Sequence, residues 1–110
     1  MDTNKIIQKT FEVSQEFDKR GAYYDKKERV LDLVEEVGEL AQAVLMVEGV
    51  KKTSDPKKQK TIEDVKDALC DCTFALIHLA REYDADLFEE YTKMLDRLKA
   101  RLDSGEFDRR

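Results

Sequence analysis

Apolar residues recur every three or four positions along most of the chain, which is the period of an α-helix with one buried face. Four such stretches can be separated, because each follows a capping residue and three of them end near a glycine. None shows the alternation typical of a β-strand. The pattern predicts helices over residues 3–19, 26–48, 62–83 and from 87 to just before Gly105, with caps at Asp2 or Thr3, Asp25, Thr61 and Asp86.

Residues 50–60 contain five lysines and the only proline, Pro56, with hardly any apolar residue. This composition is typical of a solvated loop, with a helical turn that begins at Pro56. A chain of 110 residues suffices for one apolar core. We therefore expect the loop to connect helices within a single domain that spans residues 1–110.

The second and third predicted helices are apolar around more than half of their circumference, so one neighbour cannot bury either of them. We expect both at the centre of an all-α, four-helix fold. Gly38 indicates close approach of another helix, because glycine weakens a helix interior. A core of this size is small, and self-association would hide more apolar surface. The expected state is a homodimer or a homotetramer.

Charge and length exclude several classes of partner. The formal net charge of −5 opposes binding to a phosphate backbone, so nucleic acid is not an expected partner. The apolar runs fall far short of the roughly 20 residues that span a bilayer, and the N-terminus does not resemble a secretory signal. Cys70 and Cys72 would point apart on a helix, which argues against a disulfide or a zinc site. We expect a cytoplasmic protein without a membrane partner.

Acidic residues gather on one side of each central helix. Like charges at helical spacing destabilise an exposed helix by roughly 0.2–0.5 kcal/mol per pair, and a hard cation such as Mg²⁺ would offset this repulsion. The same spacing is also typical of an ordinary solvated helix face, so both interpretations stay open. At about 100° per residue, the two strips are Glu35, Glu36 and Glu39, and Asp64, Asp67 and Asp71, which His78 and Glu82 continue.

The segment Leu33–Ala41, LVEEVGELA, resembles the signature of the MazG-like nucleotide pyrophosphohydrolases, an all-α group of enzymes. That signature has two adjacent glutamates, a third three residues later, and a second helix carrying Glu-x-x-Asp. Residues 67–76 resemble the second helix, with Asp71 as its aspartate, and the likeness extends over about residues 30–101. Ala68 stands where the family has its glutamate, and Asp64 or Asp67 could substitute for it.

The resemblance implies a four-helix, MazG-like bundle completed by oligomerisation. It also implies hydrolysis of a nucleoside triphosphate to the monophosphate and pyrophosphate, which clears unwanted nucleotides. The implied metal ligands, for Mg²⁺ or alternatively Mn²⁺, are Glu36, Glu39, Asp71 and Asp67. Glu35 would orient or deprotonate the attacking water, and Lys93 and Arg97 would contact the substrate.

Two alternatives of other classes remain open. Because Ala68 has no ligand oxygen, the chain could be a catalytically weakened helical protein that binds nucleotide or another protein. It could also be a purely structural oligomeric bundle. The loop lysines could reach a triphosphate over the mouth of the site, but lysines in a loop are usually solvated; they are Lys51, Lys52, Lys57, Lys58 and Lys60. Lys93 and Arg97 could instead pair with acids on their own helix. His78 is interpreted as a boundary residue and not as a catalyst.

Overall fold

Residues 2–109 are described by this computed structural model, and within them the structure is helical, with no strand. The all-α prediction is confirmed, and the predicted helix ends agree closely with the observed ones. A short 3₁₀-helix begins at Pro56, as the loop composition indicated. The elements are α1 (Thr3–Lys19), α2 (Lys26–Val47), η1 (Pro56–Lys58), α3 (Ile62–Arg81) and α4 (Leu87–Asp103).

Side-chain caps determine where the helices begin. The two central helices start in capping boxes. In each box the cap side chain accepts a hydrogen bond from the backbone N–H three residues later, and the side chain of that later residue accepts one from the N–H of the cap. At α4, Asp86 accepts a hydrogen bond from the Glu89 N–H at 3.1 Å, as expected for the predicted cap. The two complete boxes are Asp25 with Glu28 and Thr61 with Asp64.

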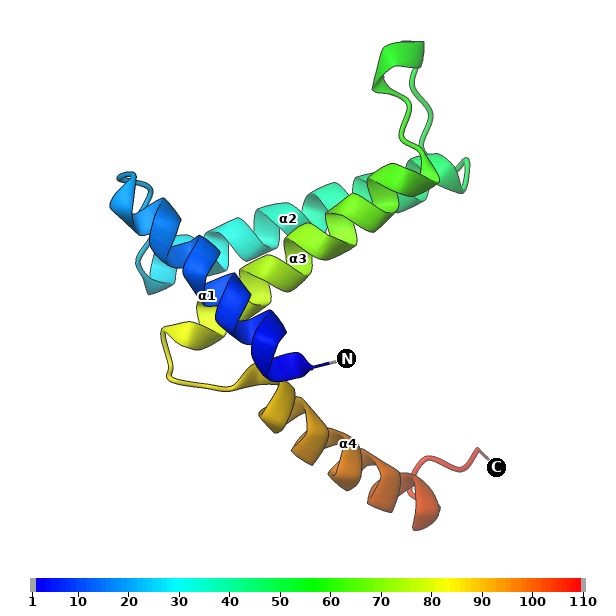
Figure 1. Ribbon diagram of the computed structural model, residues 1–110. Helices are drawn as coiled ribbons and strands as arrows, with labels where there is room; N and C mark the ends of the chain where they lie inside the picture. Colours follow the sequence, from blue (N-terminus) through cyan, green and yellow to red (C-terminus); the bar gives the residue numbers. More distant parts are fainter. Residues whose placement is uncertain (1, 110) are drawn as a thin grey trace.

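The centre of the fold is an antiparallel hairpin of α2 and α3, which lie side by side along most of their length (Figure 1). Small side chains meet where the two helices touch: Ala43 and Ala75 are 2% exposed and Ala68 is 8% exposed. Such residues allow two helices to pack closely. The buried apolar residues of the chain are Ala43, Met46, Ala68, Cys72, Ala75 and Ile77.

A buried cluster of charged groups joins α1, α2 and α3. Arg29 is 2% exposed, and its Nε atom lies 2.9 Å from a carboxylate oxygen of Glu82 and its Nη2 atom 3.8 Å from Asp18. Arg81 Nη1 donates to the Ser14 hydroxyl at 2.7 Å and lies 3.5 Å from Asp18. Two cations and two carboxylates therefore compensate one another. Glu82 belongs to this cluster and not to an exposed acidic strip.

His78 lies beside the charged cluster and packs its ring 5.0 Å from that of Phe74. It is 7% exposed, so its predicted place at the core boundary is corrected to the interior. Burial lowers the pKa of His78 from 6.5 to about 4, and the Arg29 cation acts in the same direction. The imidazole is therefore neutral near pH 7 and takes no part in an acidic surface.

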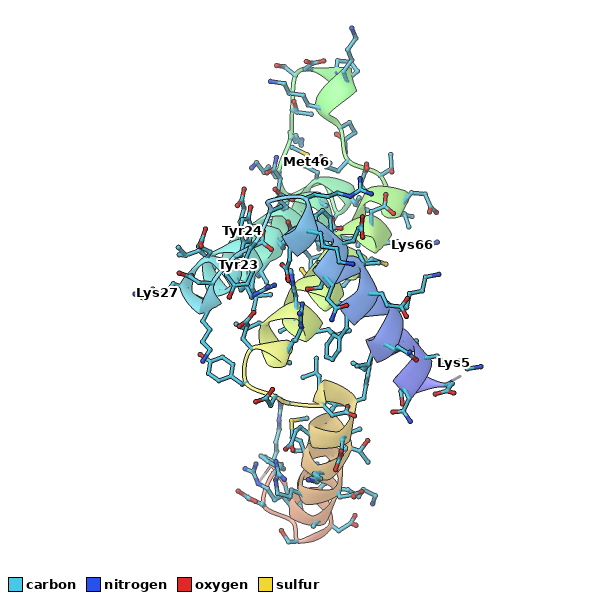
Figure 2. The ribbon with its side chains drawn as sticks, turned by 60° about the vertical axis from the view of Figure 1, so that its left-hand side comes forward. Lys5, Tyr23, Tyr24, Lys27, Met46 and Lys66 are labelled. Atoms are coloured by element: carbon cyan, nitrogen blue, oxygen red, sulfur yellow. The ribbon has the colours of Figure 1, made fainter. Side chains whose placement is uncertain are left out.

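α4 stands apart from the other helices, as both views of the chain show (Figure 1, Figure 2). It leaves α3 through Asp84, whose φ of 52° is left-handed, and each of its residues is at least partly exposed. The four helices therefore do not close into a bundle within one chain. A methyl group added at Gly38 would meet no atom within 4 Å, so the close approach expected there is not made within the chain either.

Across residues 2–109, every helix is too short or too polar to cross a membrane. The two longest helices, α2 and α3, both carry several charged residues. The expectation that the chain has no membrane-spanning segment agrees with this finding for the helices described.

We predict that lowering the pH from 7 to 5 reduces the free energy of unfolding by roughly 2 kcal/mol through His78 alone. The unfolded chain binds this proton near the ordinary pKa of 6.5, whereas the folded protein resists it down to a pKa of about 4. Stability is therefore full above pH 6.5 and falls as the pH drops through this window. Urea unfolding at both pH values measures the difference, and His78→Gln should remove that part of it. An equal pH dependence in both proteins would contradict a buried neutral His78.

Candidate functional site

The acids of α2 and α3 lie along one edge of the hairpin. Two antiparallel helices touch along one line. Residues that are rotated about their own helix axis in the same direction away from this line lie on the same edge of the pair. Glu39 and Asp71 are displaced in this way, one on each helix. A cleft of about 430 Å³ opens between the helices at this edge, and it is lined by Glu39, Gln42, Ala43, Lys60, Asp64, Asp67, Ala68 and Asp71.

Two buried alanines form the floor of this cleft, and carboxylates stand at its rim. Ala43 and Ala68 face each other from the two helices, whereas Glu39 and Asp71 are exposed. The small floor residues leave open volume between the acids. The missing glutamate of the MazG-like pattern thus corresponds to Ala68, a position that here serves helix packing.

The cleft concentrates negative charge. Glu36 is partly buried behind the rim, and burial, followed by the charges of Glu39, Asp71 and Asp32, raises the pKa of Glu36 above its ordinary value. The pKa of the Cys72 thiol is raised for the same reasons, with burial first and the neighbouring carboxylates next. Two different groups on two helices therefore experience the same negative potential.

Asp64 and Asp67, the two candidates to replace the missing glutamate, differ in how their carboxylates are used. Asp64 Oδ2 accepts from the Thr61 N–H at 2.7 Å and from the Thr61 hydroxyl at 3.0 Å. These bonds, the backbone one first, lower the pKa of Asp64. Asp67 is exposed and takes part in none of the ion pairs found among residues 2–109. Asp67 is therefore the candidate whose oxygens are not already committed to a helix cap.

Glu35, the predicted catalytic residue, is exposed on α2 and does not line the cleft. Adjacent residues of a helix point about 100° apart, so the carboxylates of Glu35 and Glu36 face different directions. The structure thus brings together Glu39, Asp67 and Asp71, with Glu36 behind them. Glu35 stands to one side of this group.

Lys93 and Arg97, the predicted substrate contacts, are not brought to the cleft. Both lie on α4, which projects from the far end of α3, whereas the cleft is near the loop end of the hairpin (Figure 1). Lys93 Nζ lies 3.7 Å from Glu89 and 3.5 Å from Glu90 on its own helix. Within one chain, this side chain has the local ion pairs that were the alternative interpretation.

Gln42 lines the cleft although the sequence did not point to it, and Lys60 lines the cleft as well. For Lys60 and the other loop lysines, contact with a triphosphate was an open alternative, although solvation was favoured. The position of Lys60 contained a signal, however, because it directly precedes Thr61, the cap of α3, and so cannot move far from the acids of the first turn. Its charge is close enough to contribute to the lowered pKa of Asp64.

The carboxylates at the cleft offer oxygen donors but do not assemble a metal site by themselves. Within residues 2–109, no three aspartate, glutamate, histidine or cysteine side chains are close enough together to hold a metal ion on their own. The donors are oxygens, which Mg²⁺ prefers, and Mg²⁺ commonly uses one or two carboxylates and completes its shell with water and substrate phosphates.

Comparison of the chain with protein-family models, curated proteins and solved structures finds no match. The resemblance to the MazG-like enzymes therefore rests on the motif residues themselves. The geometry of the cleft, with carboxylates from two helices and one lysine, is an independent observation on the same residues.

We predict that removing acids from the cleft stabilises the protein when divalent cations are absent. Glu39→Gln combined with Asp71→Asn relieves repulsion around Glu36, worth roughly 0.2–0.5 kcal/mol for each repulsive pair removed. Urea unfolding in the presence of a chelator measures the gain. Glu12→Gln, at an exposed position of α1 outside the cleft, is the matched control and should change little. A loss of stability in the double variant would contradict a repulsive cluster.

Proposed function

We propose that the protein is a Mg²⁺-dependent nucleotide pyrophosphohydrolase that converts nucleoside or deoxynucleoside triphosphates to monophosphates and pyrophosphate. Clearance of unwanted nucleotides is the corresponding cellular role. One observation carries the proposal: acids from two antiparallel helices converge on a single cleft that has a lysine at its rim. The LVEEVGELA motif, chosen from the sequence alone, supplies Glu39, one of the three α2 residues that line that cleft.

In this proposal the metal ligands are Glu36 and Glu39 of α2 and Asp71 of α3, with Asp67 in place of the glutamate missing at Ala68. A cation bound there would neutralise charge on the phosphate oxygens and lower the pKa of a bound water. Without a cation, the clustered carboxylates repel a triphosphate. Nucleotide is therefore expected to bind together with its Mg²⁺ or Mn²⁺ and not alone.

The remaining polar residues of the site position the substrate and the water. Lys60 is placed to neutralise phosphate oxygens as a mobile point charge, and Gln42 offers an amide donor beside it. Glu35 is proposed to accept a proton from the water whose oxygen attacks the α-phosphorus, while the bond to the departing pyrophosphate breaks. Most of the acceleration would come from positioning and electrostatic stabilisation.

Lys93 and Arg97 stay predictions of the resemblance. Contact between these side chains and a nucleotide in the cleft would require α4 of another chain, because α4 of the same chain projects away from the cleft. Assembly into a homodimer or homotetramer is therefore part of the proposal. The nucleotide chemistry assigned above uses only residues that line the cleft or flank it on α2.

A second function, binding of nucleotide or protein without turnover, is favoured by one observation. Ala68 supplies no ligand oxygen, and within residues 2–109 no group of three ligands is assembled around the cleft. Such a protein would still bind a cation and a polyphosphate through the same carboxylates and Lys60. Turnover is the property that separates the two functions.

We predict pyrophosphate release from at least one member of a panel of nucleoside and deoxynucleoside triphosphates, and only when Mg²⁺ is present. Glu39→Ala and Asp71→Asn should each lower the rate by roughly 100-fold or more, because each removes charge stabilisation that the reaction needs. Glu12→Gln should retain the wild-type rate.

Two other results would contradict the enzyme proposal. Stabilisation by Mg²⁺ and nucleotide in a thermal unfolding experiment, without any turnover, would support the binding protein instead. No response to either ligand would leave a structural bundle.

We predict that Lys60→Ala mainly changes KM, whereas Glu35→Gln mainly changes kcat. Loss of a phosphate contact should raise KM for the nucleotide roughly 10-fold with a small change in kcat. Loss of the proton acceptor should lower kcat by roughly 100-fold or more and leave KM similar. Steady-state kinetics on the preferred nucleotide measure both. An unchanged KM in Lys60→Ala would place this lysine outside the substrate site.

A further inference from the structure

The loop between α2 and α3 projects from the hairpin as a narrow basic arm. Residues 50–60 extend past the adjoining ends of both helices, and η1 forms the outer end (Figure 1). The lysine side chains of this loop are exposed, and none of them belongs to an ion pair found among residues 2–109. We call residues 50–60 the lysine arm; its lysines are Lys51, Lys52, Lys57, Lys58 and Lys60.

Hydrogen bonds that use no lysine side chain give the arm its shape. Asp55 caps η1 by accepting from the Lys57 N–H at 3.0 Å, and the Thr53 hydroxyl accepts from the Asp55 N–H at 3.2 Å. At the base of the arm, the Gln59 amide donates to the Met46 carbonyl at the end of α2, at 3.4 Å. The lysines are therefore presented on a shaped segment, and replacement of their side chains leaves these bonds intact.

The arm separates positive charge from the rest of the molecule. It contains five lysines and one acid, a charge of +4, so the remainder of the chain carries −9. The net charge of −5 opposes a phosphate backbone where charges of both signs are mixed over one surface. Salt at about 0.1 M screens exposed charges beyond about 10 Å, so a polyanion at the outer end of the arm experiences mainly the lysines. The arm therefore suits a polyanion, whereas the acidic remainder does not.

The distribution of the lysines along the arm favours a groove over a flat surface. Lys57 and Lys58 belong to η1 at the outer end, whereas Lys51 and Lys52 follow shortly after α2, near the base. A flat anionic membrane would meet the outer end alone, and η1 carries no large apolar side chain that could enter the lipid. A groove between two rows of phosphates would surround the arm and meet the lysines at both levels.

We propose that the lysine arm binds in the major groove of double-stranded DNA and contacts the phosphates on either side. This groove is about 12 Å wide and admits a two-stranded ribbon, whereas the minor groove, about 6 Å wide, does not. Both views show the arm as two limbs joined by η1 (Figure 1, Figure 2). The arm contains neither arginine nor an aromatic residue, so its contacts are point charges on phosphates and read no base sequence.

This binding is independent of the proposed nucleotide chemistry. It rests on the four lysines outside the acidic cleft, and Lys60, which lines the cleft, keeps its side chain in every variant. Failure of the pyrophosphohydrolase proposal would leave the DNA contact untouched. A protein that hydrolyses nucleotides without binding DNA would overturn the arm proposal alone.

The first test is the binding of a short fluorescein-labelled DNA duplex, measured by fluorescence anisotropy. Four phosphate contacts predict that the affinity falls roughly 100-fold between about 50 and 200 mM salt. At the lower salt concentration we expect a dissociation constant in the micromolar range, as for other contacts that read no sequence. No binding by the wild-type chain at the lower salt concentration would overturn the proposal.

Two variants with four substitutions each assign the binding to the arm. Replacing the four arm lysines with glutamine should weaken DNA binding by roughly 100-fold or more, because every phosphate contact is lost. The control replaces four exposed lysines outside the arm, removes the same charge and should bind nearly as well as the wild type. Equal weakening in both variants would reduce the effect to net charge and overturn the proposal. The arm variant carries Lys51→Gln, Lys52→Gln, Lys57→Gln and Lys58→Gln, and the control carries Lys5→Gln, Lys9→Gln, Lys19→Gln and Lys27→Gln.

Competition experiments identify the groove and separate DNA from other polyanions. Methyl green, which occupies the major groove, should displace the protein, whereas distamycin, which occupies the minor groove, should not. Vesicles of phosphatidylserine and phosphatidylcholine, and single-stranded DNA, should bind less tightly than the duplex. Displacement by distamycin alone, or equal or tighter binding to vesicles or to the single strand, would overturn the proposal. So would an arm variant that binds DNA as the wild type does but has lost affinity for a triphosphate.

Discussion

The packing of α2 against α3 through small side chains determines where everything else in the molecule lies. Ala43, Ala68 and Ala75 are nearly inaccessible, so small side chains make up much of the buried surface of this hairpin. Because the helices are antiparallel, each residue displaced from that line is assigned to one of two sides of the hairpin. The motif acids fall on one side and the valines on the other. A larger side chain at either floor alanine would both fill the cleft and push the hairpin apart.

Two groups of acids at opposite ends of the hairpin, one of them including Asp18 of α1, illustrate two ways of holding carboxylates. Near the start of α2, Glu82 and Asp18 lie against the Arg29 and Arg81 guanidinium groups, so their charges are compensated within the fold. Nearer the start of α3, the exposed Asp71 has carboxylate neighbours. Together these carboxylates contribute to the raised pKa values of Glu36 and Cys72. A fold that compensates acids at one end and leaves them uncompensated at the other gains nothing in stability from the second group. A cation brought with a substrate would supply the missing compensation.

Periodicity and capping chemistry predicted the helices well, because both depend only on neighbouring residues. Helix arithmetic also predicted which acids share a face, and Glu39 and Asp71 do meet at one cleft. The same arithmetic could not tell that the strip on α3 changes character at Glu82, because Arg29 comes from a distant part of the chain. Lys60 could not be separated from the other loop lysines for a related reason: a loop composition describes average exposure and not the position of one side chain beside a cap.

The tertiary role of the apolar stripes was the least predictable feature. The valine-rich pattern of α2 was interpreted as the mark of a central helix, and a single chain leaves much of it exposed, with Val34 at 66%. Gly38 likewise indicated a close neighbour that the chain itself does not supply. A one-dimensional pattern states that a surface is to be buried, but the partner can be the same chain or another copy. The sequence therefore predicted the helices and their apolar faces, but not which of those faces the single chain leaves exposed.

A crystal structure with Mn²⁺ and a non-hydrolysable triphosphate tests whether acids from both helices form one cation site. Anomalous scattering would locate the manganese ion. We expect an anomalous peak in the cleft, from a manganese ion bound by oxygens of Glu39, of Asp71 and of the phosphates. A peak elsewhere, or nucleotide bound away from the cleft, would contradict this expectation.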